Sequence, residues 1–126
     1  MRLDKFVELD EKLMNLLVKQ EDFLTDAVRR SQAAGLPAIE VSPAQGQFLY
    51  LLAKLSGARR ILEIGTLAGY STLFFAKSLP DEGGTVVTLE SDPDTASVAE
   101  ENFMASPYRN KIQLLVGQAK NTMRLL

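Results

Sequence analysis

The sequence predicts an α/β fold built around a parallel sheet with flanking helices. Three short apolar runs, at residues 60–64, 85–89 and 111–116, have the length and composition of strands. Segments with helical patterns separate them, at residues 70–79 and 93–105. Because this β-α-β-α-β alternation favours right-handed crossovers between parallel neighbours, we expect the strands to lie in the spatial order 3-2-1.

Helices are expected before the first strand. Apolar residues recur at intervals of mostly three or four from Leu3 to Val28, which indicates one or two amphipathic helices ending before Gly35-Leu36-Pro37. The segment Ser42-Pro43-Ala44-Gln45 predicts a further helix start, with serine as N-cap, proline at the first helical position and glutamine closing a capping box. This helix is expected to run to about Leu55.

The absence of histidine and cysteine narrows the chemistry that the chain can perform. The 126 residues include no histidine and no cysteine, so the chain offers no histidine base, no serine–histidine triad and no zinc–thiolate site. The net charge of -2 gives no general attraction for nucleic acid or anionic membranes. No apolar run approaches the ~20 residues that span a bilayer. We therefore predict a cytoplasmic protein that binds neither nucleic acid nor membrane.

Residues 63–71, EIGTLAGYS, have the pattern of a strand end, a glycine turn and a helix start. Such a turn directs backbone N–H groups and the positive end of a helix dipole toward an anionic group of a ligand. Glu90 follows the second strand, and one carboxylate can accept hydrogen bonds from both hydroxyls of a ribose. A turn at Gly117 follows the third strand. Because the carboxyl ends of parallel strands meet at one edge, we predict a crevice there for a ribosylated cofactor.

The motifs together resemble a known family. The glycine spacing is G-x-x-x-G, with Tyr-Ser directly after it, an acid after the second strand and Gly-x-Ala after the third. This combination is similar to class I S-adenosylmethionine (SAM)-dependent methyltransferases. The chain most resembles the small cation-dependent O-methyltransferases of the catechol and caffeoyl-coenzyme A type, whose helix before the first strand opens with a segment like VSPAQGQ, residues 41–47. The resemblance covers residues 39–126 and implies the N-terminal half of a Rossmann-like methyltransferase domain, with residues 1–38 as an N-terminal helical segment.

The resemblance implies a set of SAM-binding residues. The set is Val41, Glu63, Gly65, Gly69, Tyr70, Ser71, Glu90, Ser91, Gly117, Gln118 and Ala119. Val41 and Ser71 would hold the methionine carboxylate, Glu63 and Gly65 would face its ammonium group, and Tyr70 would line the pocket near methionine and ribose. Glu90 would bind the ribose diol beside Ser91, and the Gly117 turn would border the adenine.

Structural roles compete with several of these assignments. Ser71 stands early in a helix and is also a candidate helix cap. The glycines are also suited to close packing in a strand-to-helix turn. Glu63 ends a strand that we expect to be buried, where an unpaired charge is costly. We therefore expect a ligand ammonium or backbone donors to satisfy its carboxylate.

The resemblance also implies a function. Members of the family continue past the third strand, and their next strand supplies an acidic metal ligand and a lysine near the reacting hydroxyl. The sequence stops at Leu126, so the resemblance implies a truncated chain, with the catalytic residues and a divalent cation such as Mg²⁺ in a full-length parent and no metal site in this chain. The predicted activity is methyl transfer to a hydroxyl of a small phenolic or catecholic acceptor. This chain would carry the cofactor-binding half, and we expect it alone to bind SAM weakly and to be inactive.

Alternatives stay open for the function and for the assembly. One is a catalytically silent SAM-binding or dimerisation module, and another is an NAD-binding protein. Leu67 argues against the second, because the dinucleotide fingerprint needs a glycine at that position. In the order 3-2-1 the first strand becomes a bare apolar edge, which favours pairing between copies. We expect a homodimer formed through that edge or the N-terminal helices, unless those helices cover the edge.

Overall fold

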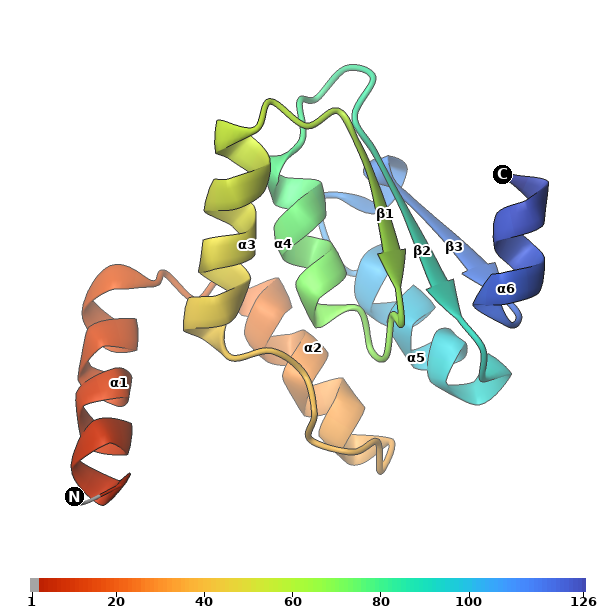
Figure 1. Ribbon diagram of the computed structural model, residues 1–126. Coiled ribbons are helices and arrows are strands. Elements are labelled where there is room, and N and C mark those ends of the chain that lie inside the picture. The colour runs from red at the N-terminus through yellow and green to blue at the C-terminus, as the bar shows by residue number, and fades with distance from the viewer. Residues whose placement is uncertain (1–2) are drawn as a thin grey trace.

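A three-stranded parallel sheet forms the centre of the structure, a computed structural model that describes residues 3–126 (Figure 1). Its strands are β1 (Arg60–Ile64), β2 (Thr85–Glu90) and β3 (Ile112–Val116). β2 pairs with both neighbours, so the order is β1-β2-β3 and the predicted arrangement is confirmed. The register aligns Ile64 with Leu89 and Glu90 with Val116, which brings the carboxyl ends of the three strands together.

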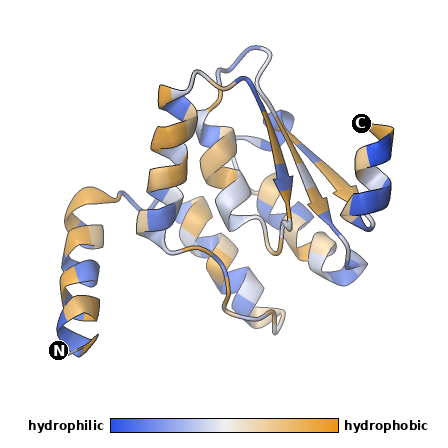
Figure 2. Cartoon of the chain, viewed as in Figure 1, coloured by the Kyte–Doolittle hydropathy of each residue, from blue (hydrophilic) through white to orange (hydrophobic). Residues whose placement is uncertain are grey.

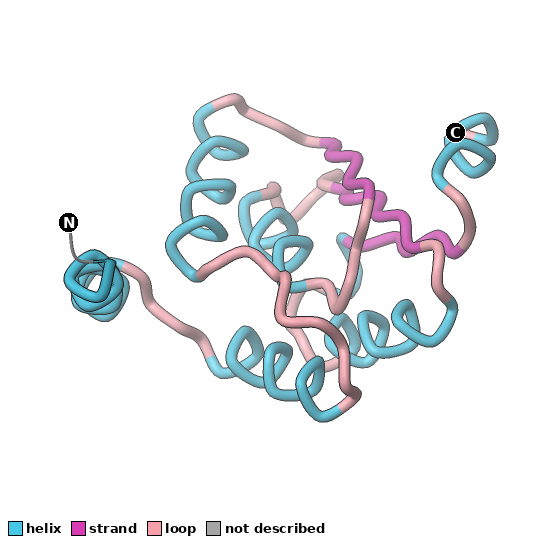
Figure 3. Tube along the Cα trace, turned by 60° about the horizontal axis from the view of Figure 1, so that its bottom comes forward, coloured by secondary structure: helices cyan, strands magenta, loops and turns pink. Residues whose placement is uncertain are grey.

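The two faces of the sheet are covered by different numbers of helices. They are α1 (Leu3–Leu17), α2 (Asp22–Ala33), α3 (Pro43–Leu55), α4 (Tyr70–Ser78), α5 (Pro93–Met104) and α6 (Ala119–Thr122), with 3-10 turns η1 (Arg109–Lys111) and η2 (Met123–Leu125). α4 and α5 pack against one face of the sheet, and α3 and α2 pack in turn against them. Among the elements of residues 3–126, only the short α6 lies on the other face (Figure 3).

The two helix starts predicted from the sequence are confirmed. The Ser42 hydroxyl accepts from the Gln45 N–H at 3.1 Å, and the Gln45 side chain accepts from the Ser42 N–H at 2.9 Å, which completes the capping box. At α5, the Asp92 carboxylate accepts from the Thr95 N–H at 3.0 Å. Both caps depend on residues only three positions apart, so the local sequence determines them.

The core lies between α2, α4, α5 and the covered face of the sheet. Its largest fully buried side chains are Phe74 on α4 and Phe103 on α5. Leu24 of α2 belongs to the same cluster, so the second N-terminal helix shares the core of the sheet region. α3 approaches α4 closely at Gly46, where an added Cβ would lie 2.3 Å from the Phe74 ring.

β1 is a partly exposed edge strand. Leu62 is 50% exposed and Ile64 is 60% exposed, because no helix covers that face of the sheet beside them. The expectation of a fully buried first strand is therefore wrong for these two side chains. The bare apolar edge expected from the strand order is confirmed.

α1 projects from the body of the molecule and does not cover that edge (Figures 1 and 3). None of residues 3–17 is buried, and apolar (orange) segments alternate with polar (blue) ones along the helix in Figure 2. Immediately after the helix, Val18 is buried, Gln20 contacts Tyr70, and Glu21 forms an ion pair with Lys77. The chain is therefore anchored just after α1, which leaves the apolar face of the helix without a partner in the described part of the chain.

Candidate functional site

The turn between β1 and α4 is bonded to the end of β2. The N–H groups of Gly65 and Thr66 both donate to the Leu89 carbonyl, at 2.9 and 3.1 Å. Gly65 and Gly69 have φ values of 90° and 84°, which glycine adopts without a steric penalty. The turn therefore lies next to Glu90, the last residue of β2.

Glu90 connects this turn to the start of the next helix. Its Oε2 accepts from the Leu67 N–H at 2.9 Å, and its Oε1 accepts from the Asp92 N–H at 3.1 Å. Each carboxylate oxygen has two lone pairs, so both remain able to accept from further donors. The carboxylate is thus oriented by backbone groups while keeping the capacity to bind two hydroxyls.

Leu67 has an unusual backbone conformation. Among residues 3–126 it is the one non-glycine residue with a positive φ, 51°. Left-handed backbone is unfavourable for a residue with a Cβ, and such outliers concentrate at functional sites. From the sequence, Leu67 only argued against a dinucleotide loop, and its contact with Glu90 carries no local sequence signal.

Glu63 is satisfied by hydroxyl groups. Its carboxylate accepts from Ser71 Oγ at 2.5 Å, from Thr88 Oγ1 at 2.7 Å and from Thr72 Oγ1. The expectation that a ligand ammonium or backbone donors would satisfy it is therefore wrong. The possible capping role of Ser71 is also absent, since Gly69 is the N-cap of α4 and Ser71 donates to Glu63.

Two adjoining cavities open over the carboxyl ends of the strands. The first, of about 380 Å³, is lined by Val41, Gly65, Tyr70, Ser71 and Glu90 among the predicted residues. The second, of about 320 Å³, is lined by Gly65, Glu90, Ser91, Gly117, Gln118 and Ala119. Because the cavities share Gly65 and Glu90, together they form one elongated site. Glu63 and Gly69 line neither of the two.

Some lining residues are absent from the predicted set. They are Ile39, Glu40, Thr66, Leu67 and Ala68 in the first cavity and Ile64, Leu89 and Lys120 in the second. Most are direct neighbours of predicted residues along the chain. Extending each predicted motif by one or two positions would have found them.

The sequence of the chain matches a known protein family. The model of the O-methyltransferase family matches residues 14–126. The chain belongs to the O-methyltransferase family. This confirms the resemblance seen in the sequence, and nothing in the site favours the dinucleotide alternative.

Named relatives of this O-methyltransferase chain agree with the match. A catechol O-methyltransferase of Niastella koreensis is 45% identical over 114 residues, which is 90% of this chain and 51% of that protein. A catechol O-methyltransferase of Mycobacterium tuberculosis is 42% identical over 119 residues, 94% of this chain and 54% of that protein. The chain therefore spans about half the length of these relatives.

Solved O-methyltransferase structures share the fold. The enzyme TomG from Streptomyces achromogenes, in complex with SAM, superposes with a TM-score of 0.94 at 35% identity, over all of this chain and 56% of that one. An O-methyltransferase from Bacillus cereus in complex with S-adenosylhomocysteine (SAH) gives a TM-score of 0.90 at 38% identity, over 94% of this chain and 53% of that one. The structure thus has the fold of the N-terminal half of a Rossmann-like methyltransferase domain.

Tyr70 forms a wall of the first cavity in this O-methyltransferase chain. Its hydroxyl lies 3.4 Å from the Gln20 side-chain amide, and its ring packs edge-on against Phe74 with a centroid distance of 5.3 Å. Burial raises the pKa of the Tyr70 hydroxyl above its ordinary value of 10.0; the hydrogen bond to Gln20 lowers that pKa, and the nearby Glu40 raises it. Tyr70 is therefore neutral at physiological pH and can offer a hydrogen bond but not a charge.

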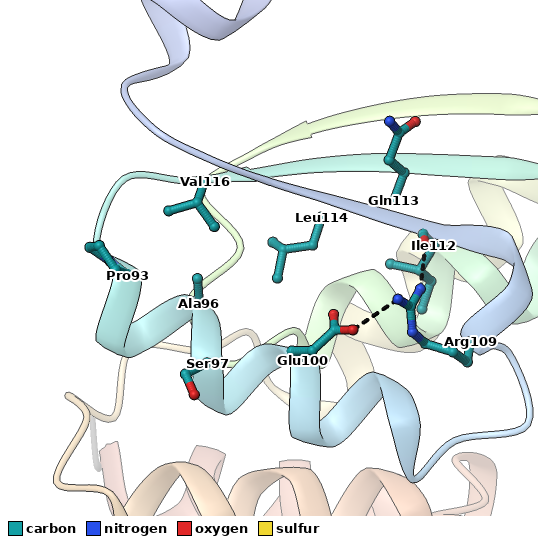
Figure 4. Close-up of a pocket in the computed structure, with 9 residues that line it drawn as sticks. All are labelled: Pro93, Ala96, Ser97, Glu100, Arg109, Ile112, Gln113, Leu114 and Val116. Atoms are coloured by element: carbon teal, nitrogen blue, oxygen red, sulfur yellow. Dashed lines mark hydrogen bonds and ion pairs between the residues drawn. The ribbon is translucent and has the colours of Figure 1, made fainter.

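Another cavity, of about 570 Å³, lies between α5 and β3 and contains none of the predicted site residues (Figure 4). Apolar side chains line much of it, including Leu114 and Val116. Its charges are already paired, because Arg109 donates to Glu100 at 2.8 Å and to the Ile112 carbonyl at 2.9 Å. We assign no ligand to it.

The described residues do not supply a metal site or a membrane span. No group of three or more acidic, histidine or cysteine side chains that could hold a metal ion occurs within residues 3–126. We therefore assign no metal-dependent step to these residues. In the same range, none of the helices is long and apolar enough to cross a membrane.

Proposed function

We propose that this chain forms the SAM-binding half of an O-methyltransferase that acts on a small phenolic or catecholic hydroxyl. The observation that carries the proposal is the position of Glu90, at the junction of two cavities and with both oxygens oriented by backbone N–H groups. The names of the most similar relatives support a catecholic acceptor. The bound ligands of the similar structures support SAM as the methyl donor.

The elongated site fits the parts of SAM in order. Glu90 accepts from the two ribose hydroxyls, and the cavity at Gly117, Gln118 and Ala119 holds the adenine. The methionine end occupies the cavity beside Val41 and Ser71. The Ser71 hydroxyl donates to Glu63, so we assign the methionine carboxylate to the backbone at the N-terminus of α4, where the first N–H groups have no acceptor within the helix.

The reaction needs precise placement of the donor. SAM supplies a methyl group on a positively charged sulfur; the acceptor oxygen forms a bond to the methyl carbon as the carbon–sulfur bond breaks, and SAH and a proton are released. Alignment of the two reactants supplies much of the rate enhancement in such transfers. The residues described here hold and orient the donor, and none of them is assigned as the base.

A divalent cation such as Mg²⁺ belongs to the acceptor side of the proposal. A cation bound by the two neighbouring oxygens of a catechol would lower the pKa of the reacting hydroxyl. The side chains of residues 3–126 do not fit such an ion. We therefore place no step of the cation on them.

We also propose that the chain forms a homodimer through its exposed apolar surfaces. α1 exposes Leu3, Phe6, Val7, Leu9, Leu13, Leu16 and Leu17, and α3 exposes Phe48, Leu51, Leu52 and Leu55. Apolar side chains exposed in such number along two helices are typical of an association surface. The β1 edge adds Leu62 and Ile64. Sedimentation that shows a monomer at micromolar concentration would contradict this assembly.

The test of the proposed activity is transfer of an isotopically labelled methyl group from SAM to catechol, with Mg²⁺ present, by the protein that contains this sequence. We expect labelled methyl ether and SAH in equal amounts. Glu90→Ala should lower kcat/KM by at least tenfold, because the donor loses its ribose contacts. The matched control is Glu82→Ala, which removes an exposed acid in the turn before β2, away from the site. Binding of SAH without transfer to any hydroxyl acceptor would favour the silent module instead.

A further inference from the structure

A fully buried asparagine lies behind the glycine turn. Asn102 on α5 is 0% exposed. Its Nδ2 donates to the Ala68 carbonyl in the turn at 2.8 Å and to the Ala27 carbonyl of α2 at 3.4 Å. Its Oδ1 accepts from Arg30 Nη1 at 3.1 Å. The Asn102 side chain thus connects the turn and α5 to α2, although it lines neither cavity of the site.

Arg30 and two backbone carbonyls together fix which way this amide points. A guanidinium group only donates hydrogen bonds, so it requires the Asn102 oxygen on its side. The amide nitrogen is then directed to Ala68. Rotating the amide by half a turn would face donors against Arg30 and an oxygen against the Ala68 carbonyl, so the arrangement has a single favourable orientation.

The turn is therefore held from two sides at adjacent residues. On the cavity side, Glu90 accepts from the Leu67 N–H at 2.9 Å. On the core side, Asn102 donates to the Ala68 carbonyl at 2.8 Å. Between these contacts, Leu67 has the left-handed backbone that a residue with a Cβ avoids. Such a conformation persists only where its surroundings impose it.

We propose that Asn102 is a positioning residue for the cofactor site, acting through the Ala68 carbonyl. It fixes the turn in the shape in which the Leu67 N–H reaches Glu90, and so it keeps the Glu90 carboxylate oriented toward the ligand. The ligand-binding part of the inference rests on the proposed function. The effect on the turn itself does not.

The first test compares SAH binding by Asn102→Asp and wild type. Aspartate has the same size and keeps an acceptor for Arg30, but it places an oxygen against the Ala68 carbonyl. The loss of a buried donor is expected to raise the SAH dissociation constant roughly tenfold. The matched control is Ser106→Ala, a buried hydroxyl just past the end of α5 that bonds the Phe103 carbonyl and the Tyr108 N–H and not the turn. It should change the dissociation constant less than about twofold.

The same substitution in a Leu67→Gly protein separates positioning of the turn from general destabilisation. Glycine adopts left-handed backbone freely, so a Leu67→Gly chain depends less on the contact with Asn102. Asn102→Asp should then cost clearly less affinity in the Leu67→Gly background than in wild type. An equal loss in both backgrounds would show that Asn102 does not act through the turn.

Amide hydrogen exchange tests the inference without any ligand. Asn102→Asp should speed exchange of the Leu67 and Gly69 amides by more than about tenfold, while amides of α3 keep their rates. If Asn102→Asp does not fold, Asn102→Ala takes its place, because it removes the donor to the Ala68 carbonyl without burying a new charge. Absence of SAH binding by wild type would contradict the proposed function alone. Unchanged exchange at Leu67 would overturn the role of Asn102.

Discussion

The backbone N–H of Leu67 donates to Oε2 of Glu90 at 2.9 Å, so the glycine turn after β1 and the acid after β2 form one unit. The acid orients the turn, and the turn orients the acid. A substitution at either residue is therefore expected to affect both the stability of the apo protein and its affinity for the ligand.

Replacing Glu90 tests its ribose role. Glu90→Ala should weaken SAH binding by about 1.5–3 kcal/mol, because hydrogen bonds to a charged group are lost. Glu90→Gln keeps one acceptor oxygen, so its affinity for SAH should lie between those of wild type and Glu90→Ala. Equilibrium dialysis with labelled SAH measures the effect, with Glu82→Ala as the control that keeps wild-type affinity. Wild-type affinity in the Glu90→Ala variant would remove this role.

Replacing Leu67 tests the strain in the turn. Leu67→Ala keeps a Cβ at a φ of 51°, whereas Leu67→Gly relieves it. We expect the glycine variant to be more stable than the alanine variant by about 1 kcal/mol, because left-handed backbone costs a residue with a Cβ about that much. Urea denaturation of both variants measures the difference. Equal stability would mean that the turn does not hold Leu67 under strain.

Gly69 is expected to affect the stability of the protein through packing. An added Cβ would lie 2.2 Å from Cε1 of the fully buried Phe103, and the φ of Gly69 is 84°. Gly69→Ala should therefore lower the free energy of unfolding by about 2–4 kcal/mol, from overpacking and backbone strain together. Gly57→Ala is the control, since its φ is 66° and no heavy atom lies within 4 Å of the added Cβ. It should cost only the strain, about 1 kcal/mol. Similar losses in the two variants would contradict the packing role.

The cap of α5 gives a prediction about pH. The hydrogen bond from the Thr95 hydroxyl, followed by the bond from the Thr95 N–H, lowers the pKa of Asp92 below its ordinary value of 3.8. A carboxyl whose pKa is lower in the folded state contributes stability above its unfolded pKa and loses that contribution as the pH falls through the folded pKa. Asp92→Ala should thus lower the thermal midpoint at pH 7, and the difference from wild type should shrink below about pH 3.8. A difference that is the same at both ends of the pH range would argue against this cap.

The elements that could be predicted from the sequence are those with local causes. The Ser42 capping box and the Asp92 cap each need residues three positions apart, and the strands are short apolar runs between turns. The bond from Leu67 to Glu90 spans 23 positions, and the bond from Asn102 to Ala68 spans 34. No periodicity or motif encodes such pairs, so both were missed.

The same reason explains the errors at Glu63 and Ser71. Three hydroxyls surround the Glu63 carboxylate, and one comes from Thr88 on the neighbouring strand, whose position follows only from the register of the sheet. Ser71 resembles a cap in sequence, but the left-handed Gly69 starts α4 and leaves the serine one residue inside the helix. The ligand roles of the eleven residues, the division at residue 38, the cytoplasmic location and the dimer stay predictions.

Calorimetric titration of this chain with SAH, and separately with NAD, tests the central claim most directly. The structure provides a carboxylate oriented by backbone N–H groups between two adjoining cavities, and Leu67 stands where a dinucleotide loop needs glycine. We predict saturable binding of SAH with one site per chain and no measurable binding of NAD. Tighter binding of NAD than of SAH, or no binding of SAH, would contradict the account.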